Sequence, residues 1–202
     1  MSDTPAGGRL PFLGLTGGIG AGKSTALEAL DELGAATLSA DAVVHELLST
    51  PEVRSAIIDR LGGNVLDSSG DVDRAAVAGH VFERPHDRAW LEGMLWPRVG
   101  ARVVEWRQEV GLREPLPQAA VVEVPLLFEA GMESVFDATV VVIADEPLRS
   151  ERAAARGHTA LAERTGRQLS QTEKADRADH VVRNDGTREE LKAKLSRILA
   201  TI

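Results

Sequence analysis

Residues 13–25 read LGLTGGIGAGKST, and this stretch decides the fold. An apolar run at 12–15 leads into glycines that stop a strand, and residues 23–33 then show the apolar spacing of a helix. Every fixed position of G-x-x-x-x-G-K-[ST] is filled, from Gly17 to Ser24. The sequence therefore predicts a phosphate-binding loop between a buried strand and the helix that follows it.

The residue types in this loop suit the binding of a triphosphate. Glycines permit a tight turn that brings backbone N–H groups close to phosphate oxygens, and the positive end of the following helix adds to the attraction. Lys23 can reach the β- and γ-phosphates, and the Ser24 hydroxyl can bind Mg²⁺. The predicted nucleotide-binding residues are Gly18, Ile19, Gly20, Ala21, Gly22, Lys23, Ser24 and Thr25.

Other nucleotide-binding motifs fit the chain poorly. The dinucleotide pattern G-x-G-x-x-G would need a third glycine where Lys23 stands. The sequence contains no N-K-x-D guanine-reading motif. Residues 67–70, DSSG, match D-x-x-G, but four turn-forming residues in a row predict a loop. A P-loop protein is indicated, and switches, motors and kinases all stay open on this motif alone.

The composition of the 202 residues is typical of a folded α/β domain with added helices. Aromatic residues make up only 3%, so aliphatic side chains must supply the core. A net charge of −8 argues against a broad contact with nucleic acid. No apolar run approaches the roughly 20 residues that span a membrane, and the lack of cysteine excludes disulfides. We expect a cytoplasmic protein with a disordered leader at 1–9.

Apolar runs that alternate with helical patterns predict an α/β fold, with a parallel sheet of about five strands flanked by helices. The expected strands are residues 12–15, 36–39, 119–124, 139–144 and a short one at 181–182. The helices expected to alternate with them are residues 23–33, 42–48, 53–61, 147–156, 160–167 and 187–199. The last helix opens with Thr187 and Glu190 at capping-box spacing.

The middle of the chain has a different pattern. Residues 73–82 and 86–110 read as helices with no strand between them, and Pro97 is expected to kink or divide the second. We therefore predict three parts: a P-loop core at 10–51 and 113–202, a helical insertion at 52–112, and, within the core, an arginine-rich segment at about 149–170.

Two acidic residues follow predicted strands, at the edge where open α/β sheets bind ligands. Asp41 comes just after the strand at 36–39 and can accept the proton of an attacking hydroxyl. Its position equally suits an N-cap of a helix that begins at Ala42, and both roles can hold together. Glu123 ends the third strand, a usual place for the acidic residue that holds Mg²⁺ through water.

Five arginines gather in one stretch of this acidic chain: Arg149, Arg152, Arg156, Arg164 and Arg167. They follow the fourth predicted strand, where small-molecule kinases carry a closing lid. Guanidinium groups there would neutralise charge on a transferred phosphoryl group. A solvated helix face with i,i+4 ion pairs is the alternative interpretation.

Tryptophans and histidines carry weaker signals. Trp90, Trp96 and Trp106 lie in the predicted insertion and suit either core packing or an acceptor pocket. The five histidines show no metal-ligand spacing, so we expect them to be structural or surface residues.

Together these motifs resemble those of the dephospho-coenzyme A kinase family, from about residue 12 to the C-terminus. Residues 15–25 nearly repeat the family's P-loop, and Ala40-Asp41 before an apolar helix is similar to its second motif. Residues 124–129, VPLLFE, are close to its P-L-L-x-E signature. Further matches are Asp73-Arg74 ahead of Val81-Phe82, the lid residues Arg152, Arg156, Arg164 and Gln168, and Ala178-Asp179 through Asn184 and Gly186.

The resemblance implies a P-loop core with a helical substrate domain and a lid. It implies a reaction that moves the γ-phosphoryl of ATP to the ribose 3′-hydroxyl of dephospho-coenzyme A. The roles that it implies are as follows: Asp41 as the base; Lys23, Arg152 and Arg156 on the phosphates and the transferred group; Asn184 at the adenine; Ser24 and, through water, Glu123 at Mg²⁺; and Arg74, Pro125, Leu126, Glu129 and Arg164 at the acceptor. The expected partner is this small acceptor, with no nucleic acid and no membrane, and the expected state is a monomer or a weak homo-oligomer.

Four features depart from the family pattern. Ser39 stands where the family usually has the first aspartate of D-A-D, Trp96 where it has the histidine of an H-P pair, and Glu123 where an aspartate is common. The lid between Arg156 and Arg164 is a few residues short. Three interpretations stay open: ordinary variation among dephospho-coenzyme A kinases, a diverged kinase for another nucleotide or nucleoside ribose, and a catalytically idle nucleotide-binding protein.

Overall fold

The computed structural model describes residues 9–155 and 168–202. The chain forms two compact units: a core unit of Met1–Ser39 with Arg107–Ile202, and a helical unit of Ala40–Trp106. The helix expected at 160–167 lies outside the described ranges, as do Arg156, Arg164 and Arg167.

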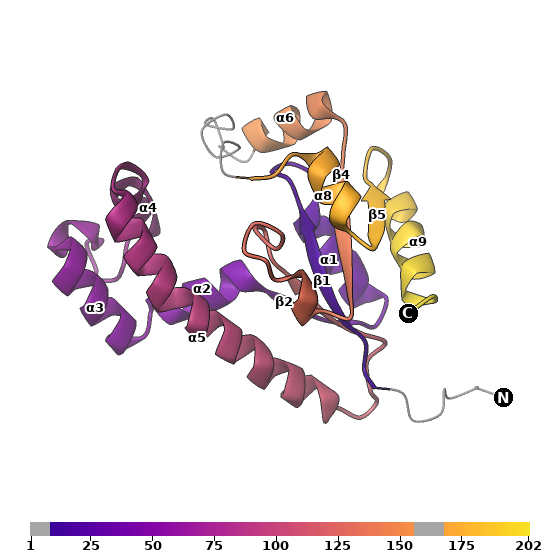
Figure 1. Cartoon of the computed structure of the whole chain (residues 1–202), viewed down its shortest axis with the longest axis horizontal. Coiled ribbons are helices and arrows are strands. Elements are labelled where there is room, and N and C mark those ends of the chain that lie inside the picture. Colours follow the sequence, from indigo (N-terminus) through magenta and orange to yellow (C-terminus); the bar gives the residue numbers. More distant parts are fainter. Residues whose placement is uncertain (1–8, 156–167) are drawn as a thin grey trace. The chain divides into compact units, whose positions relative to one another are not determined.

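The core unit is built on one parallel sheet (Figure 1). Its five strands are β1 (Phe12–Gly17), β2 (Ala36–Ser39), β3 (Ala120–Glu123), β4 (Ala138–Ile143) and β5 (His180–Arg183), in the order β2-β3-β1-β4-β5. All neighbouring strands are parallel, so their carboxyl ends meet at one edge of the sheet. The predicted α/β fold with a five-stranded parallel sheet is confirmed.

Helices α1 (Lys23–Glu32) and α9 (Arg188–Leu199) pack against this sheet. Leu30 of α1 and Leu195 of α9 are buried in the same cluster as the strand residues Leu13 and Val140. Figure 1 shows α9 beside β5 at the edge of the sheet. Parallel strands covered by helices carry continuous apolar sequences rather than an alternating pattern, which is why β1, β3 and β4 were recognisable.

Between β4 and β5, the described residues of the core unit form helices α6 (Glu146–Ala155) and α8 (Gln171–Arg177). The sequence pattern does not predict α8. Its N-cap is Ser170, whose hydroxyl accepts from the Glu173 N–H while the Glu173 carboxylate accepts from the Ser170 N–H. The capping box predicted for Thr187 and Glu190 is present at the start of α9.

The helical unit contains α2 (Ala40–Leu48), α3 (Pro51–Leu61), the 3₁₀ turn η1 (Gly63–Val65), α4 (Arg74–Glu83) and most of α5 (Pro85–Gly111). Leu48 of α2 joins Val53 and Ile57 of α3 in its core, so this unit begins at Ala40 rather than at residue 52. It ends at Trp106 because the next residue belongs to the core unit, where the Arg107 guanidinium lies 4.2 Å above the Phe12 ring.

Two local predictions in the helical unit have clear outcomes. Of the kink or division predicted at Pro97, the division is wrong, because helix α5 continues across this residue. Proline lacks the N–H that would bond one turn earlier, and Arg98 supplies a donor in the same turn, from Nη1 to the Met94 carbonyl over 2.8 Å. The turn predicted at 67–70 is confirmed, because Asp67 Oδ1 accepts from the Ser69 N–H at 2.9 Å and from the Asp71 N–H at 3.0 Å.

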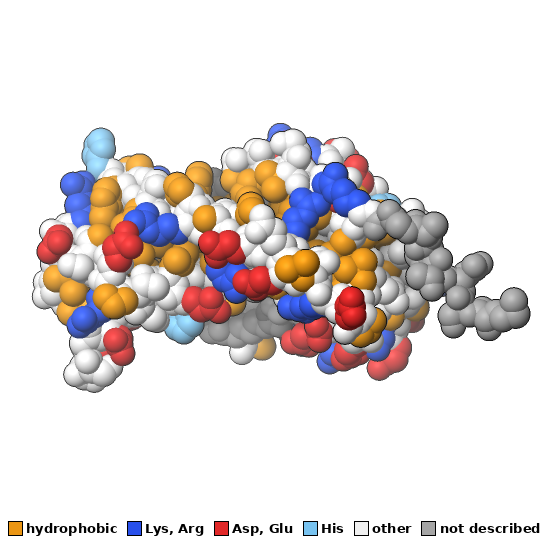
Figure 2. Space-filling model, turned by 90° about the horizontal axis from the view of Figure 1, so that it is seen from below, with side chains coloured by type: hydrophobic (Ala, Val, Ile, Leu, Met, Phe, Trp, Pro, Cys, Tyr) orange, Lys and Arg blue, Asp and Glu red, His pale blue; other side chains and the backbone are white. Residues whose placement is uncertain are grey.

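Charges of both signs lie among hydrophobic side chains on the face that Figure 2 shows. Across the described residues, none of the helices combines the length and the apolar character that a bilayer crossing requires.

Candidate active site

The phosphate loop connects β1 to α1 and turns sharply at glycines. Gly20 and Gly22 have φ values of +76° and +98°, in the left-handed region that side chains rarely adopt. A Cβ on Gly20 would also collide with the backbone carbonyl of Arg149, and one on Gly22 with the side-chain amide of Asn184. The loop backbone therefore lies directly against α6 and against the residue that follows β5.

Lys23 is the first residue of α1, and its side chain turns back over the loop. Its Nζ donates to the Gly18 carbonyl at 3.4 Å, and the same carbonyl accepts from the Ala21 N–H at 3.2 Å. Ser24 follows in the first turn of α1 and is exposed. The ammonium group and the hydroxyl predicted to bind phosphate and Mg²⁺ thus lie on successive residues at the start of α1, directly after the loop.

A cavity of about 370 Å³ opens beside the loop. It is lined by Gly20, Gly22, Thr25, Arg152, Ala155, Asn184, Gly186 and Arg188. Asn184 is only 6% exposed, and its Nδ2 donates to the Ala21 carbonyl at 2.9 Å. Arg152 Nη1 donates to the Asn184 carbonyl at 3.0 Å. Predicted nucleotide contacts from three distant parts of the sequence therefore share one cavity.

Arg149 holds α6 against the loop, a contact that the sequence reasoning did not identify. Its side chain is nearly buried, with Nε donating to the Ile19 carbonyl at 3.0 Å and Nη1 paired with Glu146 at 2.6 Å. A second cavity, of about 490 Å³, is lined by Arg149, Gly18, Glu146 and residues 168–173. The sequence did offer a signal for this contact. Arg149 and Arg152 are three positions apart on one helix, so both side chains are expected on the same face of it.

Glu123 lies at the carboxyl end of β3, as predicted, and is 6% exposed. The register pairs it with Leu15 of β1 on one side and Ser39 of β2 on the other. The Ser39 hydroxyl donates to Glu123 Oε2 over 3.1 Å. Carboxylate and hydroxyl oxygens are ligands that Mg²⁺ accepts, so these residues fit a role near the cation.

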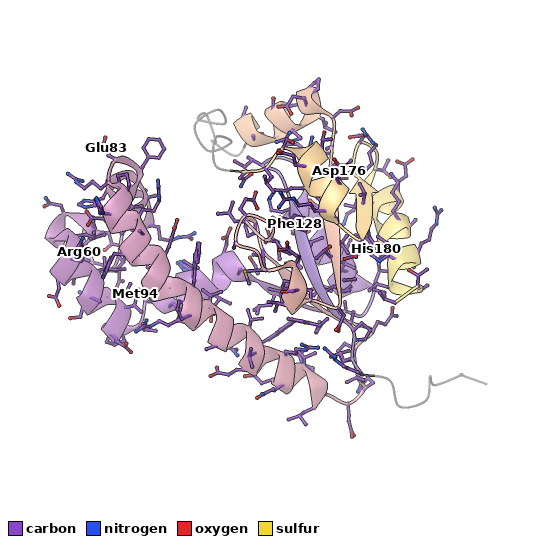
Figure 3. All side chains as sticks on the ribbon, viewed as in Figure 1. Arg60, Glu83, Met94, Phe128, Asp176 and His180 are labelled. Atoms are coloured by element: carbon purple, nitrogen blue, oxygen red, sulfur yellow. The ribbon has the colours of Figure 1, made fainter. Side chains whose placement is uncertain are left out.

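The loop after β3 carries three residues predicted to contact the acceptor, and two of them are engaged inside the core unit. The Pro125 carbonyl accepts from Lys174 Nζ at 2.8 Å and from the Thr16 hydroxyl at 3.3 Å. Glu129 Oε1 accepts from Lys174 Nζ at 3.0 Å and from the Leu169 N–H at 2.8 Å. Leu126 is half-buried, and Phe128 of the same loop is buried in the core unit (Figure 3).

The remaining predicted residues of the described part belong to the helical unit. Asp41 is the second residue of α2 and is exposed. Because α2 begins at Ala40 and not at Ala42, the N-cap interpretation of Asp41 is wrong. Arg74 is the first residue of α4 and is exposed, and Asp73 before it caps the helix by accepting from the Ala75 and Ala76 N–H groups.

The tryptophans divide between the two roles considered for them. Trp106 is buried and Trp90 packs against the core of the helical unit, as core packing predicts. Trp96 is 54% exposed, so core packing does not account for it. Among the histidines, His80 is structural: its Nε2 lies 3.1 Å from Asp87 Oδ2, and this contact lowers the pKa of Asp87.

A strand, a G-x-x-x-x-G-K-[ST] loop and a helix at the edge of a five-stranded parallel sheet define a P-loop kinase fold. Two solved structures share this fold: the dephospho-CoA kinase from Campylobacter jejuni, with a TM-score of 0.63, 23% identity and coverage of 95% of this chain and 96% of that chain, and a shikimate kinase from Bacteroides thetaiotaomicron, with a TM-score of 0.51, 13% identity and coverage of 96% and 98%.

The relationship is closer at the level of sequence. The family model described as dephospho-CoA kinase matches residues 11–190. A dephospho-CoA kinase from Deinococcus radiodurans is 40% identical over 190 residues, which span 93% of this chain and 90% of the relative. The crystal structure of TT1252 from Thermus thermophilus has a TM-score of 0.80 and 30% identity, and covers 96% of this chain and 99% of that chain. This chain belongs to the dephospho-CoA kinase family, and the predicted resemblance is confirmed.

Proposed function

We propose that this chain transfers the γ-phosphoryl of ATP to the ribose 3′-hydroxyl of dephospho-coenzyme A, the last step of coenzyme A synthesis. The observation that carries the proposal is the family match over residues 11–190, a range that contains an intact phosphate loop beside a cavity of about 370 Å³. The family match does not favour either alternative, the diverged kinase or the catalytically idle binding protein.

The donor is proposed to lie along the phosphate loop, with its base in the cavity beside Asn184. Loop amides and Lys23 would hold the phosphates. The bond from Arg152 to the Asn184 carbonyl supports a role for this arginine at the base end of the site rather than at the transferred phosphoryl. The role at the transferred phosphoryl group is proposed for Arg156, which lies outside the described residues.

Mg²⁺ is proposed to bind through the Ser24 hydroxyl and, by way of water, through Glu123. Glu123 suits this role because it is a largely buried carboxylate at the carboxyl end of a strand, held by the Ser39 hydroxyl. When bound, the cation would neutralise charge on the β- and γ-phosphates. The contribution of the chain itself is to fix the position of the carboxylate.

Asp41 is proposed to accept the proton of the acceptor 3′-hydroxyl as the hydroxyl attacks. Its carboxylate lies in the first turn of α2, directly after the strand that ends at Ser39, and it has no role as an N-cap. Arg74, Leu126 and Arg164 are proposed to contact the acceptor. The inward contacts of Pro125 and Glu129 support a role in shaping that loop.

The partner of the chain is a small molecule, and we propose that nucleic acid is not a partner, in agreement with the net charge of −8. We further propose a monomer or weak homo-oligomer, and a cytoplasmic location, which the absence of cysteine supports.

An acceptor screen tests the proposed function. The purified chain, with ATP and Mg²⁺, is given dephospho-coenzyme A, AMP, adenosine and other nucleosides in parallel, and ADP release is followed. We expect dephospho-coenzyme A to be consumed at least about a hundred times faster than any other acceptor, because a site built to hydrogen-bond its substrate discriminates by about 10⁴- to 10⁵-fold against an analogue that lacks the bonding group. Faster turnover of AMP or a nucleoside would establish another acceptor. ATP binding without transfer would establish a binding protein. Lys23→Ala serves as a blank for contaminating kinases.

A further inference from the structure

Lys174 is a charged residue of α8 whose side chain has 0% exposed surface. Lysine is almost never fully buried unless it is paired, because an ammonium group taken out of water loses several kcal/mol of hydration. Nothing in the proposed chemistry uses this residue. A buried ammonium group needs hydrogen-bond acceptors from the protein, and Lys174 has them.

The ammonium group of Lys174 bridges two points of the loop after β3. Its Nζ donates to the Pro125 carbonyl at 2.8 Å and to Glu129 Oε1 at 3.0 Å. The Glu129 side chain is itself only 14% exposed, and its Oε1 also accepts from the Leu169 N–H. Burial lowers the pKa of Lys174, and the neighbouring Glu129 carboxylate opposes that shift. Lys174 thus joins both ends of the 125–129 loop to α8.

The Pro125 carbonyl is also bonded to β1. The Thr16 hydroxyl donates to it at 3.3 Å, and Thr16 immediately precedes Gly17, the first residue of the phosphate-loop motif. The preceding residue, Val124, donates its N–H to the Leu15 carbonyl at 2.9 Å. The turn that follows Glu123 is therefore held between the start of the phosphate loop and Lys174.

Helix α8 is itself fixed to the sheet by a second side chain. Gln171 makes two hydrogen bonds of 2.9 Å with the backbone of Ala144, the residue after β4: Oε1 accepts from the N–H and Nε2 donates to the carbonyl. A side chain on a helix anchored in this way holds its own partners in a defined place. Lys174 therefore holds the turn after Glu123 at a defined position relative to the carboxyl end of β4.

We propose that Lys174 is a positioning residue that fixes the turn after β3, and with it the Glu123 carboxylate, relative to the phosphate loop. The proposal rests on the proposed function in one respect, namely that Glu123 holds the Mg²⁺ of the donor nucleotide. Groups bonded directly to metal ligands typically contribute 10- to 100-fold to metal affinity, and Lys174 acts further away, through the turn after a carboxylate that reaches Mg²⁺ by way of water, so we expect an effect at the lower end, about tenfold. Loss of Lys174 should therefore weaken the response to Mg²⁺ much more than it weakens the binding of the metal-free nucleotide.

The test measures the binding of a fluorescent ATP analogue with excess Mg²⁺ and with EDTA. Lys174→Met keeps an unbranched stem of four heavy atoms without the ammonium nitrogen, but it leaves Glu129 as a buried carboxylate without its counter-charge, which costs stability. The double variant Lys174→Met with Glu129→Gln removes that charge as well, so we expect it to fold while the bond to Pro125 is absent. Glu129→Gln alone keeps that bond. Lys192→Met is the matched control, since Lys192 is a partly exposed lysine of α9 paired with Glu32.

We expect the double variant to bind the analogue in EDTA within about twofold of wild type and to lose roughly tenfold or more of the affinity gained from Mg²⁺. Lys192→Met should keep the wild-type gain, and Glu129→Gln, which retains the bond from Lys174 to the Pro125 carbonyl, should lose less of it than the double variant. A double variant with the full wild-type gain would overturn the proposal. An equal loss with Mg²⁺ and with EDTA would overturn it too, because Lys174 would then act on the whole site. None of these readouts involves the acceptor, so failure of the proposed reaction is recognised separately.

Discussion

Ser39 and Glu123 contact each other at the carboxyl ends of adjacent strands, where the serine hydroxyl donates to Glu123 Oε2 over 3.1 Å. Both are positions at which the resemblance to the family predicts another residue. A hydroxyl can donate to a carboxylate, whereas a second carboxylate could do so only in its protonated form. The two departures therefore form one matched pair of side chains.

Removing the hydroxyl should weaken both the fold and the reaction. Ser39→Ala deletes one hydrogen bond to a largely buried carboxylate, so we expect a loss of about 1 kcal/mol in the free energy of unfolding. We also expect a fall in kcat of up to about tenfold, in proportion to that energy. Urea denaturation and initial rates check both values. An unchanged unfolding midpoint together with unchanged kcat would show that the contact contributes nothing.

Ser39→Asp should make stability depend on Mg²⁺. The substitution places a second carboxylate against Glu123, and two like charges at this distance repel. We expect the melting temperature to fall in EDTA and to recover with Mg²⁺, because the cation compensates the added charge. Thermal denaturation under the two conditions measures the difference. Equal melting temperatures with and without Mg²⁺ would contradict the placement of the cation near this pair.

Asp41→Asn should separate binding from chemistry. The amide keeps the size of the side chain but cannot accept the proton of the attacking hydroxyl, so kcat should fall by about 10²- to 10⁴-fold. The nucleotide affinity should stay within about twofold of wild type. Glu46→Gln, another exposed carboxylate of α2, is the matched control and should behave as wild type. Turnover that survives in Asp41→Asn would exclude Asp41 as the base.

Two glycine-to-alanine changes should have opposite effects. At Gly22, with φ +98°, a Cβ would collide with the Asn184 amide, so we expect loss of nucleotide binding and a destabilisation on the order of 1–3 kcal/mol. An added Cβ on Gly100 in α5 would meet no atom of the described residues within 4 Å apart from its chain neighbours and the nearby backbone of its own helix, and Gly100→Ala should stabilise by roughly 0.5–1 kcal/mol. Titration with nucleotide and thermal melting measure the two outcomes, and a Gly22→Ala variant that binds ATP normally would contradict the described loop.

Asp179 should make the fold sensitive to acid. Its Oδ2 accepts from the Thr139 hydroxyl and N–H, each at 2.8 Å, and these bonds lower the pKa of Asp179. The folded pKa is below the unfolded value, so the stabilisation is complete above the unfolded pKa and is lost as the pH falls through the folded one. Asp179→Asn should flatten the loss of stability below about pH 4. Asp176→Asn, at an exposed residue of α8, is the control. Identical acid slopes in all three proteins would contradict the prediction.

The phosphate loop and the sheet could be predicted because short-range patterns determine them. Glycine spacing, continuous apolar strands and the Thr187–Glu190 capping box all act over a few residues. Helix α5 shows the limit of such patterns: Pro97 removes one hydrogen bond, but a bond from Arg98 and the packing of Leu95 act in the same part of the helix.

The rest depended on contacts between distant residues. Helix α8 has one fully buried side chain in seven residues, and that side chain is a lysine, so no apolar spacing marks it. The sequence signal for α8 is the Ser170–Glu173 capping box, which marks where the helix begins. The partners of Glu129 and Arg149 lie on other elements, and a single sequence does not show which charges are buried together.

The most direct test of the account is the identity of the product. The chain is incubated with ATP, Mg²⁺ and dephospho-coenzyme A, and the mixture is followed by ³¹P nuclear magnetic resonance. We predict a new phosphomonoester signal that grows in step with ADP and couples to the ribose 3′ proton. Release of inorganic phosphate alone, or a phosphoryl group on any other position, would contradict the proposed transfer.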